Sequence, residues 1–183
     1  MKHVNPSKLL WVDLEMTGLE PTKDRIVEIA VIVTDWDFTE LASFESGVRQ
    51  NEREIRKLFA DNPWTAARAE TQGEIERSLK SPSEQDVEAE IIKLIDAHFA
   101  EGEPVILAGN SIHCDRGFIK QWWPEVEKRL HYRMLDVSAW KVVMQSKYRL
   151  MFNKKETHQA LPDIRESIAE LKFYLDRSKF KVK

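Results

Sequence analysis

Two carboxylates stand two residues apart in the first apolar stretch of the chain, at Asp13 and Glu15. Residues 9–15 are expected to form a strand, and because strand side chains alternate between faces, both carboxylates should point the same way. Neighbouring buried carboxylates repel each other and lose hydration, so a divalent cation between them would keep them ionised, and oxygen ligands suit Mg²⁺ or Mn²⁺. The alternative is a strand edge that faces water, where such a pair costs little.

Three further residues could join this pair. Asp115 follows the apolar residues 104–108 by a short loop, and open α/β sheets place their sites at the carboxyl ends of strands. Asp163 lies in the expected first turn of the last helix, and His158 lies in the loop before it. Taken singly, Asp115 could be a helix-start residue that interacts with the helix dipole, and His158 could be an ordinary structural histidine.

In combination, these residues indicate phosphoryl chemistry. Four carboxylates can hold two divalent ions, which clamp the attacking and leaving oxygens of an in-line displacement. An imidazole can take the proton of an attacking water near neutral pH, so His158 is the candidate general base.

The elements expected to hold these residues begin with three strands, over residues 9–15, 26–34 and 41–48. Each is an apolar or alternating run next to turn-forming residues. No helical pattern separates them, so an antiparallel meander is expected. Two more short strands, 104–108 and 134–137, would bring the sheet to five strands.

Helical patterns accompany the last two strands. A helix is expected to begin near Ser81, with Ser81 as N-cap, Pro82 at the first helical position and Glu84 closing a capping box. Another is expected over residues 115–123, ended by Pro124. The apolar residues of the last helix recur at helical spacing, at Ile164, Ile168, Leu171 and Leu175. The whole pattern predicts an α/β fold with a central mixed sheet flanked by helices.

Length and composition fit this architecture. The 183 residues, 42% hydrophobic and 32% charged, suit one globular domain with a sizeable core. Cys114 is the single cysteine, which excludes an intrachain disulfide and fits a reducing compartment. No apolar run approaches the ~20 residues of a bilayer span, and the first is too short for a signal peptide, so a cytoplasmic protein without a membrane partner is expected.

The charge distribution is uneven. The net charge is −3, which does not indicate a globally basic nucleic-acid binder. Residues 128–183 nevertheless hold 14 Lys/Arg and 6 Asp/Glu, whereas residues 1–127 hold 14 and 25. One end could therefore carry a basic surface while the other concentrates carboxylates; uneven surface charge without function is the alternative.

Three segments together resemble the motifs of the DEDDh exonucleases. They are residues 13–19 (Asp-Leu-Glu-Met-Thr-Gly-Leu), 109–115 (Gly-Asn-Ser-Ile-His-Cys-Asp) and 158–163 (His-Gln-Ala-Leu-Pro-Asp). Two more segments, 131–138 (His-Tyr-Arg-Met-Leu-Asp-Val-Ser) and 163–171, narrow the resemblance to the oligoribonucleases.

The resemblance implies one exonuclease domain over residues 1–183, with a core of about 8–176 and a short basic tail at 177–183. It implies a ribonuclease H-like fold and a homodimer. The implied activity is the removal of 5′-mononucleotides from the 3′ end of very short RNA, dinucleotides included. Two divalent ions would be held by Asp13, Glu15, Asp115 and Asp163, with His158 as general base.

The resemblance also implies a substrate site. Its expected members are Met16, Leu19, Trp64, Ser111, Tyr132, Arg133 and Lys141. Leu19 would wedge at the bases and Trp64 would stack on one. Tyr132 and Arg133 would reach across the dimer to the terminal phosphate, while Ser111 and Lys141 would add polar contacts.

One pair of residues departs from the family pattern, and three alternative functions compete with this interpretation. Ala69 and Glu70 replace a His-Thr pair of the family, so a histidine expected near the phosphate is absent. The first rival is another DEDDh exonuclease, of the proofreading or tRNA-trimming kind. The second is a catalytically silent RNA-binding module, which would require a missing ligand. The third, a glycosidase with two carboxylates, leaves His158 without a role.

Overall fold

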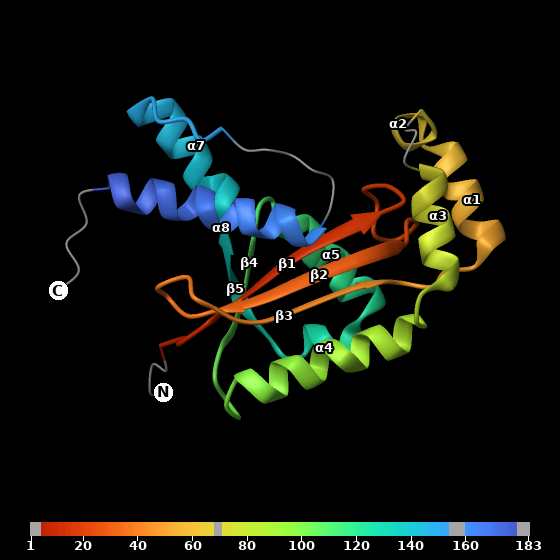
Figure 1. Ribbon diagram of the computed structural model, residues 1–183, viewed down its shortest axis with the longest axis horizontal. Helices are drawn as coiled ribbons and strands as arrows, with labels where there is room; N and C mark the ends of the chain where they lie inside the picture. Colours follow the sequence, from red (N-terminus) through yellow and green to blue (C-terminus); the bar gives the residue numbers. More distant parts are fainter. Residues whose placement is uncertain (1–4, 68–70, 154–159, 179–183) are drawn as a thin grey trace.

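A five-stranded sheet in the order β3-β2-β1-β4-β5 forms the centre of the molecule (Figure 1). The computed structural model describes residues 5–67, 71–153 and 160–178. The strands are β1 (Leu9–Met16), β2 (Ile26–Thr34), β3 (Glu40–Gly47), β4 (Val105–Gly109) and β5 (Leu130–Asp136). The first three pair antiparallel, while β4 pairs parallel with both β1 and β5. The predicted mixed five-stranded sheet and its meander are confirmed.

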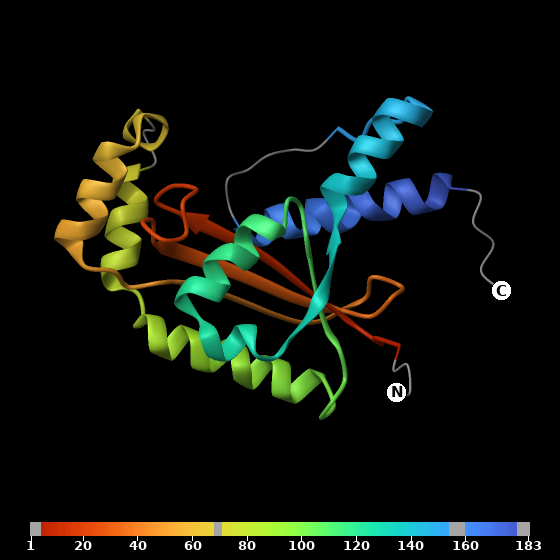
Figure 2. The ribbon, with the colours of Figure 1, turned by 180° about the vertical axis from the view of Figure 1, so that it is seen from behind.

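Helices cover both faces of β1, so both sets of alternating side chains are buried. On one face, Leu10, Val12 and Leu14 pack in a core with residues of α4 (Glu84–His98) and α5 (His113–Trp122). On the other face, Leu9 and Trp11 pack with residues of α8 (Ala160–Arg177) and with Val137 of α7 (Val137–Tyr148). Figure 2 shows the sheet from behind, with α5 and α4 in view.

Three helices gather at the end of the sheet where β1 ends (Figures 1 and 2). They are α1 (Glu52–Asp61), α2 (Pro63–Ala66) and α3 (Thr71–Lys80). Their small core consists of Val27, Ile55, Phe59 and Ile75. The buried residues Ile55, Leu58 and Phe59 of α1 do stand at helical spacing, so the sequence carried a signal for this helix that was missed.

The predicted start of α4 was wrong by two residues. Ser83 is the N-cap, and its hydroxyl accepts a hydrogen bond from the Asp86 amide at 3.2 Å. The Pro82 carbonyl accepts the Arg49 amide in an isolated bridge, which keeps this residue in extended chain outside the helix. Ser81 instead donates its hydroxyl to the Arg77 carbonyl at the end of α3.

The bounds of two other elements also differ from expectation. The α5 helix begins at His113, and Pro124 starts the short α6 (Pro124–Glu127) as well as following the end of α5. The β5 strand begins at Leu130 rather than 134, because Leu130 pairs with Val105 of β4. The α7 helix, with few buried residues, was not predicted.

The last helix is confirmed. Ile164 and Leu171 are buried, and Ile168 and Leu175 pack partly buried against the same core. Within the described ranges, no helix is both long and apolar enough to cross a bilayer.

Candidate active site

Asp13 and Glu15 continue the stripe of β1 that faces α8. Leu9 and Trp11 are the buried members of that stripe, and the strand stays regular until a register shift between Glu15 and Met16. Alternation therefore places both carboxylates on one face, as predicted. Each is only partly buried, whereas Leu9 and Trp11 are fully buried.

Asp115, in the first turn of α5, contacts the edge of β1. The pairing of β1 with β4 extends only to Trp11, opposite Ala108, and β4 ends at Gly109. Gly109 approaches β1 closely, since a Cβ there would stand 2.9 Å from the Val12 carbonyl oxygen. Beyond that point Asp115 Oδ1 accepts a hydrogen bond from the Leu14 amide at 3.0 Å. The side chain thereby takes the place of a neighbouring strand.

The electrostatics of this carboxyl group are unfavourable. Asp115 is 6% exposed, and its pKa is raised well above the usual range, first by burial and then by the negative charges of Asp13 and Glu15. The hydrogen bond from Leu14 opposes this shift. Three carboxyl groups thus lie within electrostatic reach of one another, which is a donor set that a hard divalent cation would stabilise. As arranged in the described segments, however, no three His, Cys, Asp or Glu side chains meet the geometry of an ion site.

Asp163 lies in the first turn of α8, on the face of the sheet that carries Asp13 and Glu15. Its neighbours Ala160 and Ile164 belong to the same core as Trp11. The Ser167 hydroxyl donates to the Asp163 carbonyl at 2.9 Å and accepts from the Asn110 amide at 2.8 Å. This chain of bonds joins the first turns of α8 to the end of β4. The predicted general base, His158, lies outside the described residues.

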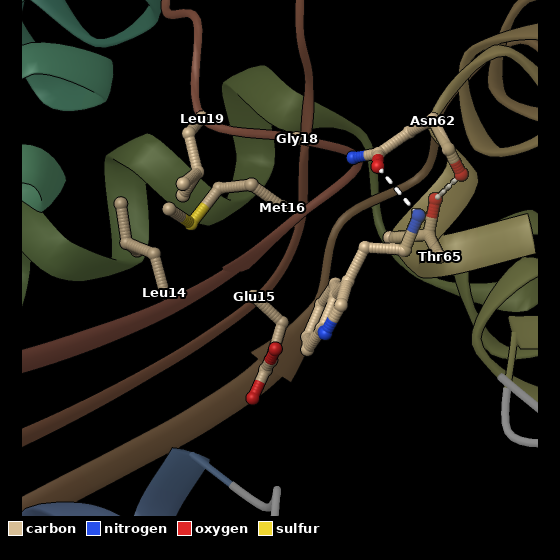
Figure 3. A pocket seen from close by; sticks show the side chains of 8 residues that line it. Leu14, Glu15, Met16, Gly18, Leu19, Asn62 and Thr65 are labelled. Atoms are coloured by element: carbon tan, nitrogen blue, oxygen red, sulfur yellow. Dashed lines mark hydrogen bonds between the residues drawn. The ribbon is translucent and has the colours of Figure 1, made fainter. Parts of the chain in front are cut away.

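A pocket of about 420 Å³ opens directly beyond β1 (Figure 3). Its lining is Leu14, Glu15, Met16, Gly18, Leu19, Asn62, Trp64 and Thr65. Leu19 is 82% exposed and Trp64 is 63% exposed, so two large apolar side chains lie exposed in the lining of one pocket. The structure therefore brings together three predicted substrate residues, Met16, Leu19 and Trp64, beside the predicted ligand Glu15.

The loop that carries Leu19 is held by a buried carboxylate. Asp24 accepts the Thr17 hydroxyl at 3.0 Å and the Glu20 amide at 2.9 Å. A Cβ on Gly18 would stand 2.5 Å from an oxygen of this carboxylate, so the close approach requires glycine. No role was predicted for Asp24, because in the sequence it is only a polar residue of the turn after Pro21.

Ser111 belongs to a second polar group at the ends of β4 and β5. Its backbone is left-handed, with φ of 49°, and its amide donates to Asp136 Oδ1 at 3.0 Å and Ser138 Oγ at 2.9 Å. Asp136 also caps α7 through the Ser138 amide at 2.8 Å. Asp136 and Ser138 were not predicted to belong to the site, although aspartate is a preferred helix N-cap residue.

Lys141 lies against a buried carboxylate rather than in the pocket lining. Its Nζ is 3.9 Å from Glu170, which is fully buried and accepts the Tyr174 hydroxyl at 2.9 Å. Burial and this carboxylate raise the pKa of Tyr174 to about 12. Glu170 was also missed, because its position on α8 is ordinary for a polar helix residue.

Tyr132 and Arg133 lie on β5, which is one of the two edge strands of the sheet. Tyr132 is 70% exposed, and the Arg133 guanidinium is 5.2 Å from its ring centre. Neither residue lines the pocket of Leu19 and Trp64. Within one chain, then, the predicted substrate residues fall into separate groups.

The arrangement defines a class of protein. The sheet is mixed and five-stranded, with carboxylates gathered where β1 and β4 part, and the model of the family described as Exonuclease matches residues 10–171. E. coli exonuclease I, in its zinc-bound complex with single-stranded DNA, superposes with a TM-score of 0.67 over 94% of this chain at 15% identity. A moderately thermophilic exonuclease I from Methylocaldum szegediense also gives 0.67, over 93% at 16% identity. The chain spans only 41% of either protein, so these likenesses show the fold, and the ribonuclease H-like prediction is confirmed.

Curated relatives narrow the class. The oligoribonuclease of Yersinia enterocolitica is 40% identical over 174 residues, which is 93% of this chain and 94% of that protein. The oligoribonuclease of Vibrio parahaemolyticus is 44% identical over 171 residues, which is 91% and 92% of the two chains. The chain therefore belongs to the oligoribonucleases of the exonuclease family, and it is a nuclease that hydrolyses phosphodiester bonds.

Proposed function

We propose that this chain is a metal-dependent 3′→5′ exoribonuclease that degrades very short RNA, dinucleotides above all, to 5′-mononucleotides. The observation that carries the proposal is the placement of buried Asp115 against β1, within electrostatic reach of Asp13 and Glu15. The chain's membership of the oligoribonucleases supports short RNA as the substrate. We propose that residues 1–183 act as one catalytic domain.

Asp13, Glu15, Asp115 and Asp163 would hold two divalent ions, Mg²⁺ or Mn²⁺. When bound, the ions would activate a water and stabilise the charge on the leaving oxygen. The Leu14 amide holds the Asp115 carboxylate in a fixed orientation at the edge of β1. His158 would take the proton of the attacking water, because an imidazole can accept it at neutral pH.

The substrate contacts follow from the size of a dinucleotide. It offers two bases and few phosphates, so affinity must come from stacking and from charge-assisted bonds to the terminal phosphate. Met16, Leu19 and Trp64 supply an apolar pocket beside Glu15. The proposed phosphate contacts are Ser111, Tyr132, Arg133 and Lys141.

A second copy of the chain would bring the two groups together. Tyr132 and Arg133 lie exposed on an edge strand and outside the pocket of their own chain. Exposed apolar residues continue along and beyond α7, at Val142, Val143, Tyr148 and Met151. Such a surface favours association, so we propose a homodimer in which each subunit completes the other's site. A cytoplasmic location fits the free Cys114.

One assay tests the activity. Purified protein with Mn²⁺ is given 5′-labelled RNAs of two to twenty nucleotides, and matched DNAs serve as the control for sugar preference. We expect stepwise shortening from the 3′ end, fastest for dinucleotides and absent with excess chelator. Internal cleavage, or equal rates at all lengths, would contradict the proposal.

Mixing an impaired and an inactive variant tests the shared site. Arg133→Ala should weaken cleavage of dinucleotides more than cleavage of longer RNA. Mixed with Asp115→Asn subunits, it should regain part of its activity, since a heterodimer contains one intact site. No recovery in a mixture whose heterodimers are verified would rule out the cross-subunit contact.

A further inference from the structure

The pocket beyond β1 has two walls that come from different parts of the chain. Leu19 projects from the loop after β1, and Trp64 projects from α2. Both side chains are largely exposed, so burial in a core does not fix their separation. Something else must hold the two backbones at a constant distance if the pocket is to accept a flat ring between them.

The Asn62 side chain joins the two walls. Its Oδ1 accepts a hydrogen bond from the Trp64 amide at 3.1 Å, and its Nδ2 donates to the Thr17 carbonyl at 3.2 Å. Figure 3 shows the amide of Asn62 between the loop of Gly18 and the helix of Thr65. An amide side chain suits this bridge, because its oxygen accepts from one partner while its nitrogen donates to the other.

Both ends of the bridge are themselves fixed. Thr17 is fully buried, its amide donates to the Arg25 carbonyl at 3.0 Å, and its hydroxyl donates to Asp24. On the other side, the Asn62 carbonyl accepts the Ala66 amide at 2.8 Å and the Thr65 hydroxyl at 3.2 Å. Because both partners of the Asn62 side chain are held in place, its hydrogen bonds can fix the distance between the Leu19 loop and the Trp64 helix.

We propose that Asn62 is a positioning residue for the substrate's base: its amide sets the separation of the Leu19 loop and the Trp64 helix. The inference rests on the proposed function, and it adds the determinant of pocket width. Asn62 touches neither the phosphate nor the carboxylates in this role, so it should govern affinity for a base and leave the chemical step intact.

The competing role for Asn62 is that of a helix N-cap alone. The chain contains a matched case, because Asn51 caps α1 by accepting the Glu54 amide at 3.1 Å and is exposed. Aspartate and serine are N-caps as good as asparagine. Asn62→Asp keeps the acceptor for the Trp64 amide but places an oxygen against the Thr17 carbonyl, and Asn62→Ser keeps the cap but is too short to bridge.

Steady-state kinetics on a dinucleotide separate these roles. We expect Asn62→Asp and Asn62→Ser to raise KM by ~5–30-fold with kcat within about twofold, since part of the stacking on one base is lost. Asn51→Asp and Asn51→Ser should leave both constants unchanged. If the two Asn62 variants behave as the wild type and only Asn62→Ala is impaired, Asn62 is a cap and the inference is overturned.

A double-mutant cycle provides the second measurement. With Trp64→Ala already present, Asn62→Asp should have little further effect, because there is no longer an indole to position. Its effect should also shrink on a dinucleotide that lacks the stacked base. Additive losses, or equal losses on the abasic substrate, would show a general structural defect instead. Wild-type protein without activity on short RNA would refute the proposed function itself.

Discussion

Asp13, Glu15 and Asp115 gather near the carboxyl end of β1, whereas Leu19 and Trp64 project into solvent just beyond that end. The first group sits on a regular strand and the start of a ten-residue helix, and Asp115 is 6% exposed. The second sits on a turn and a four-residue helix, and its two large side chains are mostly exposed. The two regions meet at Glu15, which belongs to both.

The difference separates the demands of chemistry from those of recognition. Gathering carboxylates raises the pKa of Asp115 and costs stability, so strongly packed elements are needed to impose it. Exposed apolar side chains cost the fold little, and hydrogen bonds within the loops suffice to orient them. Substitutions in the acidic group should therefore affect the chemical step and stability, whereas substitutions in the pocket should affect affinity.

The largest effect is expected for the proposed metal ligands. Asp13→Ala or Asp163→Ala should abolish turnover, a loss of at least ~10³-fold in kcat, because each removes a charge that balances the ions. Turnover of labelled dinucleotide with Mn²⁺ measures it, with circular dichroism as the control for folding. Near-native turnover in either variant, or in excess chelator, would refute the metal assignment.

His158→Ala should lose roughly 10²–10⁴-fold in kcat, as expected for loss of a general base, while metal binding is retained. The acidic limb of the wild-type pH–rate profile should report a group near the histidine reference pKa of about 6.5. The limb should disappear in the variant. A small loss with an unchanged profile would make His158 a structural residue.

Leu19→Ala and Trp64→Ala should each lower kcat/KM for a dinucleotide by ~10–100-fold, through stacking worth about 1–3 kcal/mol per base. Because both side chains are exposed, the melting temperature should stay within about 1 °C of the wild type. Thermal denaturation beside kinetics checks the pair of outcomes. A large loss of stability would mean that these side chains support the fold, and the kinetic loss could then not be assigned to substrate contact.

Asp115→Asn should stabilise the metal-free protein at neutral pH while inactivating it. The folded-state pKa of this carboxyl is raised, so its stabilising contribution is present in full below the unfolded value and is lost as pH rises through the folded value. Asparagine keeps an acceptor for the Leu14 amide without the charge. The melting temperature should exceed that of the wild type by a few degrees at pH 7–8, where each kcal/mol is worth roughly 2–4 °C.

Two controls accompany this measurement. The advantage of Asp115→Asn should shrink towards pH 4, and added Mn²⁺ should stabilise the wild type more than the variant. A metal-free variant that is less stable than the wild type at every pH would mean that Asp115 is stabilised where it lies, contrary to its raised pKa.

The smallest effect is expected for the ion pair of Arg165 and Glu40, at 3.0 and 3.2 Å. Their side chains are half exposed, so Arg165→Ala should cost less than ~1 kcal/mol of unfolding free energy, and less still in high salt. The core around Ile164 and Leu171, not this pair, should hold α8 and Asp163 in place. Glu40→Gln is the matched control, and a loss above about 2 kcal/mol in either variant would reverse that ranking.

Local pattern sufficed for the elements with strong periodicity. The β2 strand, the β1 strand to within one residue and the apolar face of α8 follow from alternation and helical spacing. The shared face of Asp13 and Glu15 follows from the same rule. The helices of residues 52–80 and α7 were not predicted. Buried residues do recur at helical spacing in α1 and α3, so their signal was missed, whereas α7 buries only Val137 and Met144 and offers little periodicity.

The sequence by itself determined the order of the strands along the chain, the residue types of the acidic group and the family to which their motifs point. Only the tertiary structure placed Asp115 on the Leu14 amide, 101 residues away, and Asn62 on the Thr17 carbonyl, 45 residues away. It also decided that Lys141 lies against Glu170 and that Tyr132 lies outside the pocket of its own chain. Side-chain alternation is a property of a few consecutive residues, whereas these contacts depend on where β4 leaves β1 and on how α1 and α2 return to its end.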